Sequence, residues 1–368
     1  MEARAYAVGR LDVEMLPARH GDAILLGWGN PDERHYMLVD GGPAPAYAGI
    51  AARLSELSGN RLDLLVLTHV DGDHIEGTIL LVNDADLKLQ IGEVWCNGSH
   101  HLVRELGPVQ GEILGALIGD RGIPWNTSFG GSAILTSPSE PFPVIDLAGN
   151  LRVTVLAPDS SALRRLRDAW LAACQEAGLG FDSPESALQA LRSKPRLTPK
   201  ASYLGRAVPD VRELARSRKG SDTSVANASS LVLLVEYGAS RVLLAGDSTP
   251  AALTPPIKRL LAHRELSSLP LTAFKLPHHG SSQNINAELV RLLPSDHFLF
   301  STNGSYFKHP DSEAVATILE YGRPDSELIF NYDNARNRQW DDDLLRDHYR
   351  YRVRYPAENG SGVVLTLG

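Results

Sequence analysis

Short apolar runs alternate with turn residues and with helically spaced apolar positions through the first hundred residues. The run at 62–67 is continuous, as in strands buried on both faces of a sheet. The segment 46–57 places apolar residues every three or four positions, which is the spacing of a helix that buries one face. This part of the chain predicts strands over 23–26, 36–39, 62–67 and 91–96, and helices over 46–57 and 77–82.

The same alternation returns after residue 230 and continues to the end. Strands are predicted over 231–237, 241–245, 271–276, 297–301, 328–331, 351–355 and 362–367, with helices over 249–265, 287–293 and 311–321. The acidic run at 341–343 predicts a further helix start, with Leu344 and Leu345 facing the core. Strands and helices in alternation predict an α/β fold, with polar residues collected at strand ends.

The segment 160–220 differs from its surroundings in pattern and in charge. Its periodicity is helical, and Ser183-Pro184-Glu185 has the composition of a helix start. It carries twelve Lys and Arg against six Asp and Glu, a net charge of +6, so the rest of the chain carries −14. We interpret it as a basic helical insertion within a single domain spanning 1–368. Its twelve basic residues could follow a phosphate backbone, or the segment could be a solvated helical surface. They are Arg164, Arg165, Arg167, Arg192, Lys194, Arg196, Lys200, Arg206, Arg212, Arg216, Arg218 and Lys219.

Composition narrows the class of protein. Apolar residues make up 43% of the chain and charged residues 22%, which is an ordinary globular mixture. No apolar stretch reaches the roughly 18–20 residues of a membrane helix, so we expect no membrane partner. Two cysteines, Cys96 and Cys174, cannot form a disulfide framework, which favours the cytoplasm. The net charge of −8 gives no global attraction to nucleic acid.

The stretch from Thr68 to Gly77 is the richest in chemistry. His69, Asp71, Asp73 and His74 fall within six residues directly after a buried strand. Imidazole and carboxylate are ligands of Zn²⁺ and of harder divalent ions. A polar loop with an aspartate capping the next helix is the simpler alternative, but such loops rarely gather two His and two Asp in this order.

These residues resemble the metallo-β-lactamase fold signature Thr-His-x-His-x-Asp-His-x-x-Gly, with Asp71 in place of the second His. The variant His-x-Asp-x-Asp-His is typical of ComEC-type proteins and their stand-alone relatives. Further blocks resemble the family in the expected order: 21–25 with 38–42, 227–233 followed by 243–247, the His-His-Gly-Ser block within 276–282, and Lys308-His309-Pro310.

The resemblance implies a four-layer αββα sandwich with one or two divalent metal ions at one edge of its sheets. It implies that His69 and Asp71 serve one ion and that Asp73 and His74 serve the other. Asp247 would bridge both ions, and His278 would complete one coordination shell. Asp40 would orient a histidine from behind the site. The implied catalytic residues are Asp73, which with Asp247 would orient or deprotonate the nucleophile, and His309, which would stabilise a phosphoryl oxygen or protonate the leaving group.

The chain departs from the general family pattern at two points. Asp71 is a harder ligand than histidine, so the site should accept Mn²⁺ as well as Zn²⁺. The isolated histidine expected between the first motif and Asp247 has only His100 and His101 as candidates, and a loop role is the alternative for both. Whether His279 is a ligand is also open.

The resemblance and the basic insertion together favour a metal-dependent phosphodiesterase or nuclease, with nucleic acid or another phosphodiester as its partner. A hydrolase of small esters, lactones or thioesters is an alternative on the same fold. A non-catalytic binding protein on a decayed enzyme fold is another. The complete set of predicted ligands argues against decay.

Overall fold

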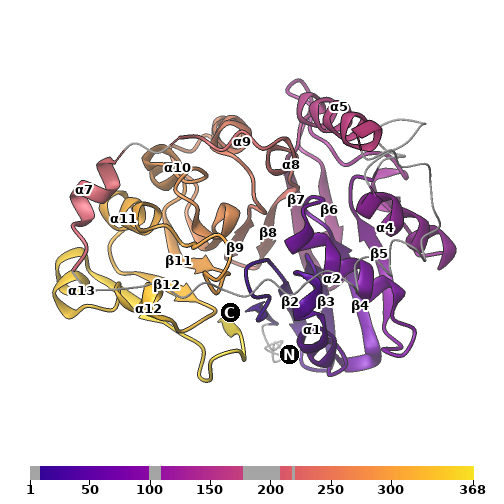
Figure 1. The fold of residues 1–368 in the computed structure, drawn as a ribbon, viewed down its shortest axis with the longest axis horizontal. Coiled ribbons are helices and arrows are strands. Elements are labelled where there is room, and N and C mark those ends of the chain that lie inside the picture. Colours follow the sequence, from indigo (N-terminus) through magenta and orange to yellow (C-terminus); the bar gives the residue numbers. More distant parts are fainter. Residues whose placement is uncertain (1–8, 99–108, 177–207, 218–219) are drawn as a thin grey trace, which may run out of the picture.

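The computed structural model describes residues 9–98, 109–176, 208–217 and 220–368, which form two β-sheets packed face to face (Figure 1). The first sheet has the strand order β14 (Val363–Leu367), β1 (Arg10–Met15), β2 (Ile24–Asn30), β3 (Glu33–Val39), β4 (Arg61–Val66) and β5 (Gln90–Trp95). The second has the order β13 (Tyr351–Arg354), β12 (Ser326–Phe330), β11 (Ser295–Phe300), β10 (Leu271–Lys275), β9 (Ser240–Leu244), β8 (Val232–Tyr237), β7 (Leu151–Ala157) and β6 (Val144–Leu147).

Three apolar clusters define four layers. The central cluster joins inward side chains of both sheets, such as Val13 of β1 and Leu233 of β8. The outer face of the first sheet packs against α1 (Tyr47–Leu54), α2 (Gly72–Asn83) and α4 (Val109–Asp120). The outer face of the second packs against α9 (Pro250–His263), α10 (Ala287–Leu292) and α11 (Ser312–Tyr321). The predicted αββα sandwich is therefore confirmed.

The two closing strands join different sheets. β13 pairs in parallel with β12, whereas β14 crosses over and pairs antiparallel with β1. Each sheet also contains neighbouring parallel strands, β3–β4–β5 in the first and β9–β10–β11–β12 in the second. Parallel strands bring their carboxyl ends to one edge, and the residues that follow those ends form the site described below.

Two sequence predictions need correction. Helix α2 begins at Gly72 and not at Gly77, because the polar residues Asp73 and His74 form its first turn. Near the C-terminus, α12 (Ala335–Arg338) precedes α13 (Asp343–Tyr349), which is capped by Asp342. Leu345 faces the core as expected, but Leu344 is 76% exposed, since adjacent helical residues point about 100° apart.

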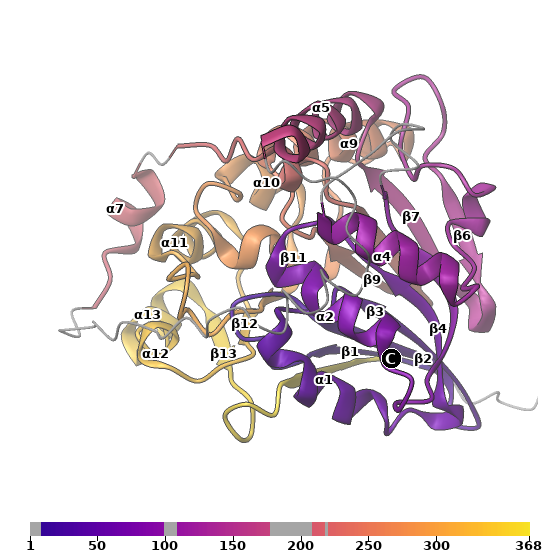
Figure 2. The ribbon, with the colours of Figure 1, turned by 45° about the vertical axis from the view of Figure 1, so that its right-hand side comes forward.

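The segment 160–220 contributes α5 (Ser160–Glu176) and α7 (Val211–Arg216), followed by the short α8 (Val225–Ala228). The predicted helix start at 183–185 lies outside the described residues. Figure 1 and Figure 2 both show α5 and α7 well apart, and α7 packs on α11 through Leu214 and Ala215. In the described ranges, no helix combines the length and apolarity needed to cross a membrane.

Helix α2 touches the end of β3 through two glycines. The amide of Gly41 donates to the carbonyl of His74, and the amide of Gly77 donates to the carbonyl of Gly42. A Cβ on Gly77 would lie 1.8 Å from the carbonyl oxygen of Gly41, so only glycine allows this approach. The contact fixes His74 beside Asp40, the residue that precedes Gly41.

We predict that Gly77→Ala lowers the free energy of unfolding by about 3 kcal/mol, because the backbone of α2 must move away from β3. Gly119→Ala on α4 is the matched control. A Cβ there meets nothing within 4 Å, so replacing this helical glycine should stabilise by about 0.5–1 kcal/mol. Urea unfolding measures both changes. Equal stability of the two variants would show that the close contact at Gly77 is not required.

Candidate metal centre

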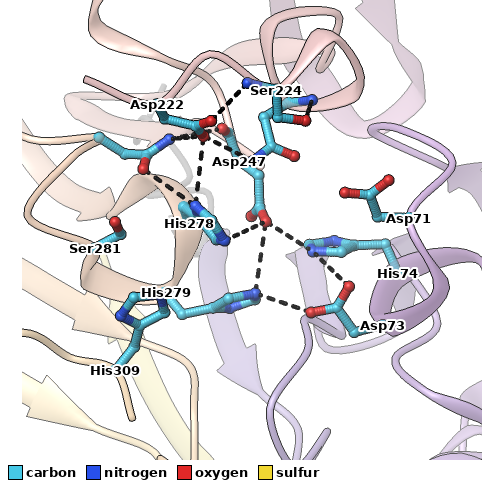
Figure 3. A network of polar contacts seen from close by, with 12 residues as sticks. Asp71, Asp73, His74, Asp222, Ser224, Asp247, His278, His279, Ser281 and His309 are labelled. Carbon is cyan, nitrogen blue, oxygen red and sulfur yellow. Dashed lines mark hydrogen bonds and ion pairs between the residues drawn. The ribbon is translucent and has the colours of Figure 1, made fainter. Parts of the chain in front are cut away.

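The predicted ligands meet at the edge of the sandwich where strands of both sheets end (Figure 3). β4 leads into the first motif, and the first turn of α2 carries its second half. β9 and β10 of the second sheet deliver the remaining residues. The residues brought together are His69, Asp73, His74, Asp247, His278 and His279, with Asp71 at the rim.

The carboxylate of Asp247 stands in the middle of the cluster. Its Oδ2 lies 3.3 Å from Nε2 of His74 and 3.9 Å from Nε2 of His69. The same oxygen is 3.7 Å from Nε2 of His279 and 3.8 Å from Nε2 of His278. An oxygen so placed can contact any ion that these nitrogens hold.

Several inward-facing atoms have no hydrogen-bond partner among the described residues. They are Nε2 of His69, His74 and His279, and Oδ1 of Asp247, all buried. Buried polar atoms normally have a hydrogen-bond partner, so four unpaired nitrogen and oxygen atoms in one cluster indicate a site for a bound ligand. Ligand atoms of His69, His74 and Asp247 lie within 4.8 Å of one another, as do those of Asp73, His74 and His279. Imidazole and carboxylate suit Zn²⁺ and Mn²⁺, so the cluster fits one or two divalent ions.

Asp40 lies behind His74, where the sequence placed it. Its Oδ2 accepts a hydrogen bond of 2.8 Å from Nδ1 of His74, and both of its oxygens accept from Thr68. Nδ1 of His69 lies 3.0 Å from the hydroxyl of Thr68. With both Nδ1 atoms occupied in this way, Nε2 of each ring faces the cluster and is the nitrogen that a metal ion would bind.

His279 is held by residues that the sequence analysis did not assign to the site. Its Nδ1 lies 2.9 Å from the carbonyl oxygen of Ser301 and 3.2 Å from Oδ1 of Asp22. Asp22 in turn forms a 2.6 Å ion pair with Lys275, and both side chains are about 2% exposed. The available signal was a lysine inside the apolar strand 271–276, because a buried ammonium group requires a buried anion.

His278 enters from the other side and is partly exposed. Its Nδ1 lies 3.1 Å from the amide oxygen of Asn284 and 3.5 Å from the carboxylate of Asp222. Asn284 also donates to Asp222 and to the carbonyl oxygen of Asp247. Asp222 therefore ties His278 to the segment that follows the insertion, a role the sequence did not reveal.

The turn that presents the two histidines has an unusual backbone. His278, His279 and Gly280 have φ values of 47°, 56° and 87°, so two non-glycine residues in succession adopt the left-handed conformation. A Cβ on Gly280 would meet Phe300 and Pro310 at 2.9 Å. Such strain persists where surrounding structure enforces it, and here it aims both rings at Asp247.

Asp71 and Asp73 differ in burial. Oδ2 of Asp73 lies 3.5 Å from Nε2 of His279, inside the cluster. Asp71 lies 3.6 Å from Nε2 of His69, and its side chain is 44% exposed. Among the residues described, neither Asp71 nor His278 belongs to a group of ligand atoms within 4.8 Å of one another. Both mark the solvent side of the site.

His309 stands next to the cluster and outside it. Its ring centre lies 5.2 Å from that of His278, and its Nδ1 lies 3.1 Å from Oδ1 of Asp311. Burial lowers the pKa of His309 despite the Asp311 carboxylate. The ring is therefore largely neutral near pH 7, with Nδ1–H directed at Asp311 and Nε2 available to exchange a proton. His100 and His101 lie outside the described residues.

Opposite charges dominate the electrostatics of the cluster. Burial opposes protonation of its histidines, yet Asp247 and the neighbouring carboxylates raise the pKa of His74 well above its ordinary value and the pKa of His279 to about 10. Burial likewise opposes ionisation of Asp247, but His74, His279 and His278 hold the pKa of Asp247 well below its usual range. The site thus attracts positive charge, which a divalent cation supplies in place of protons.

Residues 16–155 match the family model described as metallo-beta-lactamase superfamily. No curated protein gives a significant match to the sequence. Similar solved structures include the metallo-beta-lactamase fold protein YhfI from Bacillus subtilis, at 10% identity over 97% of this chain and 100% of that chain, with a TM-score of 0.40. CmlA, a diiron beta-hydroxylase from Streptomyces venezuelae, matches at 16% identity over 99% and 54%, with a TM-score of 0.39. Likenesses this distant carry no information about substrate.

We predict that Asp247→Ala removes bound metal while leaving the sandwich folded, because it deletes the oxygen that faces all four histidines. Elemental analysis after reloading with Mn²⁺ or Zn²⁺ should give one or two ions per wild-type chain and less than about a tenth of an ion for the variant. Asp146→Ala, which removes a surface carboxylate paired with Arg152, is the control and should keep its metal. Full metal content in Asp247→Ala would contradict the assignment.

Proposed function

We propose, from the match of residues 16–155 to the metallo-β-lactamase superfamily model, that this protein is a metal-dependent hydrolase of phosphodiester bonds, a phosphodiesterase or nuclease. The observation that carries the choice of phosphodiesters is the placement of helix α5, which carries three arginines, against the loop of the first motif. Leu163 and Leu166 of α5 pack on Val70, which lies between His69 and Asp71.

The arginines of α5 are available to an anionic substrate. Arg164 and Arg165 are exposed, and their hydrogen-bond partners are Ser160 and Ser161 of the same helix. Neither has a carboxylate partner within the described part of the chain. Arg167 is neutralised in part by its neighbour Asp168. Two uncompensated guanidinium groups near a metal loop favour a substrate that carries several phosphates.

A cavity of about 520 Å³ adjoins the site on the same side. Arg165 of α5 and Arg259 of α9 line it, together with Asp222, the residue that contacts His278. Arg259 lies over the ring of Phe142 and has no carboxylate partner in the described ranges. This cavity gives a substrate room to extend from the metal centre past α5.

The proposed metal set is one or two Zn²⁺ or Mn²⁺ ions held by His69, Asp71, Asp73, His74, Asp247 and His278, to which the geometry adds His279. When bound, the ions supply a hydroxide nucleophile at neutral pH and neutralise charge on the phosphate oxygens. Asp73, inside the cluster, would orient the attacking water together with Asp247. Nε2 of His309, unprotonated in the neutral ring, takes up a proton first and then donates it to a phosphoryl oxygen or to the leaving oxygen.

The direct test is hydrolysis of a panel of phosphodiesters by the metal-loaded protein. We expect turnover of at least one phosphodiester class by wild type and none above background by His69→Ala, which loses an inward-facing donor nitrogen. The same assay with small esters, lactones and thioesters provides the contrast. Turnover of those substrates alone would overturn the proposal in favour of small-molecule hydrolysis.

We predict that Arg164→Glu combined with Arg165→Glu weakens the salt dependence of polynucleotide binding. Each phosphate neutralised contributes roughly −0.7 to the slope of log K against log salt for single strands. Losing two contacts should therefore reduce the slope by about 1.4 and raise KM, with metal content unchanged.

The matched control places the same charge change on α7. Arg212 and Arg216 are exposed there, and α7 packs on α11, away from α5 (Figure 2). Glutamate at those two positions should leave the slope near the wild-type value. An equal reduction in both variants would mean that the effect comes from net charge and not from contacts made by α5.

A further inference from the structure

Two adjacent aromatic side chains project into solvent beside the metal centre. Tyr306 is 50% exposed and Phe307 is 43% exposed, on the loop that follows β11. Their ring centres lie 4.5 Å apart with planes at 86°. Several large apolar side chains are exposed among the described residues. Tyr306 and Phe307 are the aromatic ones, and the others are aliphatic and scattered along the chain. Adjacent exposed aromatic rings indicate a binding surface more strongly than isolated aliphatic groups do.

The two rings continue an aromatic series that begins in the metal centre. The ring of Phe307 lies 6.1 Å from that of His278 and is nearly parallel to that of His309, at 6.0 Å and 19°. The ring of Tyr306 stacks on His20 at 5.2 Å. An aromatic group resting on Phe307 would therefore lie next to any phosphate held between His309 and the cluster.

The loop that carries both rings is fixed by its own hydrogen bonds. The amide of Thr302 donates to the side chain of Asn331, and the amide of Asn303 donates to the carbonyl of Arg19. The amide of Ser305 donates to the side chain of Asn303. A surface fixed before binding loses little conformational entropy when a ligand stacks on it.

We propose that Tyr306 and Phe307 form a platform on which an unpaired base of the substrate stacks while its neighbouring phosphate occupies the metal centre. This inference rests on the proposed phosphodiesterase function and defines its substrate class as a single-stranded polynucleotide or another base-bearing phosphodiester. Bases in a duplex stack on each other, whereas an unpaired base presents its π-face to aromatic side chains regardless of sequence.

The platform and α5 flank the metal centre on different sides. Figure 3 shows His309, which contacts Phe307, and Asp71, which follows the Val70 contact of α5, on opposite sides of Asp247. A strand with its base on Phe307 would thus pass over the metal centre toward Arg164 and Arg165. One extended ligand would thus contact both the exposed aromatic pair and the exposed basic pair.

The test compares two substrates of equal charge, an oligothymidylate and an abasic phosphodiester strand of the same length. We expect wild type, loaded with metal, to show a KM for the oligothymidylate at least about tenfold below that for the abasic strand, since stacking on aromatic side chains has an effect of this size. Tyr306→Ala combined with Phe307→Ala should remove the difference between the substrates, with metal content equal to wild type.

Two further variants separate stacking from general apolar contact. Phe307→Trp keeps the π-face and should keep the preference, whereas Phe307→Leu keeps apolar bulk and should lose most of it. Leu266→Ala removes a side chain with the same 43% exposure elsewhere on the surface and should retain the full preference.

The outcomes distinguish this inference from the function on which it rests. Hydrolysis of both strands by wild type with equal KM, or an undiminished preference in the double variant, would overturn the platform and leave the phosphodiesterase function intact. Hydrolysis of neither strand, nor of any other phosphodiester, would overturn both.

Discussion

The buried carboxylate of Asp247 and the histidines that surround it form the constraint on which the rest of the site depends. Burial alone would keep this carboxyl group and these imidazoles neutral, but their proximity stabilises the charged forms of both. Charges that are this well buried need partners with fixed geometry, because a displacement would leave one of them uncompensated. The surrounding residues therefore serve to hold the carboxylate and the imidazoles in place.

The residues that hold the histidine rings in place come from segments that are distant in sequence. Asp40 fixes the ring of His74, the Asp22–Lys275 ion pair fixes that of His279, and Asp222 reaches His278 from the end of the insertion. Each places a carboxylate behind an imidazole, which sets the tautomer and turns Nε2 toward Asp247. Glycines at 41, 77 and 280 let the backbones approach closely enough for these contacts to form.

The sequence was sufficient for the fold class and for the clustering of residues within one motif, because the residues of a single strand-to-helix turn are close in sequence. It placed Asp40 correctly for the same reason, since a strand end and a motif can be recognised locally. It could not assign Asp22, which contacts His279 across 257 positions, and it named His278 as a ligand while leaving the neighbouring His279 open. Their orientation depends on left-handed φ values at both positions, which glycine adopts readily and which two successive histidines do not reveal.

The metal chemistry is determined by the buried cluster, whereas the substrate is determined by exposed segments beside it. This difference explains why the substrate is harder to infer than the metal chemistry. Most of the ligand geometry around Asp247 is set within the sandwich, whereas α5, the 301–309 loop and the segment carrying Asp222 lie at its edge. These segments contain the exposed arginines and the exposed aromatic pair, and they contact the centre through Val70, His278, His279 and His309. Substitutions among the exposed arginines and the exposed aromatic pair can therefore change substrate specificity without disturbing the buried charges. Replacing a surface residue changes the stability of the fold little, whereas an unpaired ion in the core would destabilise it.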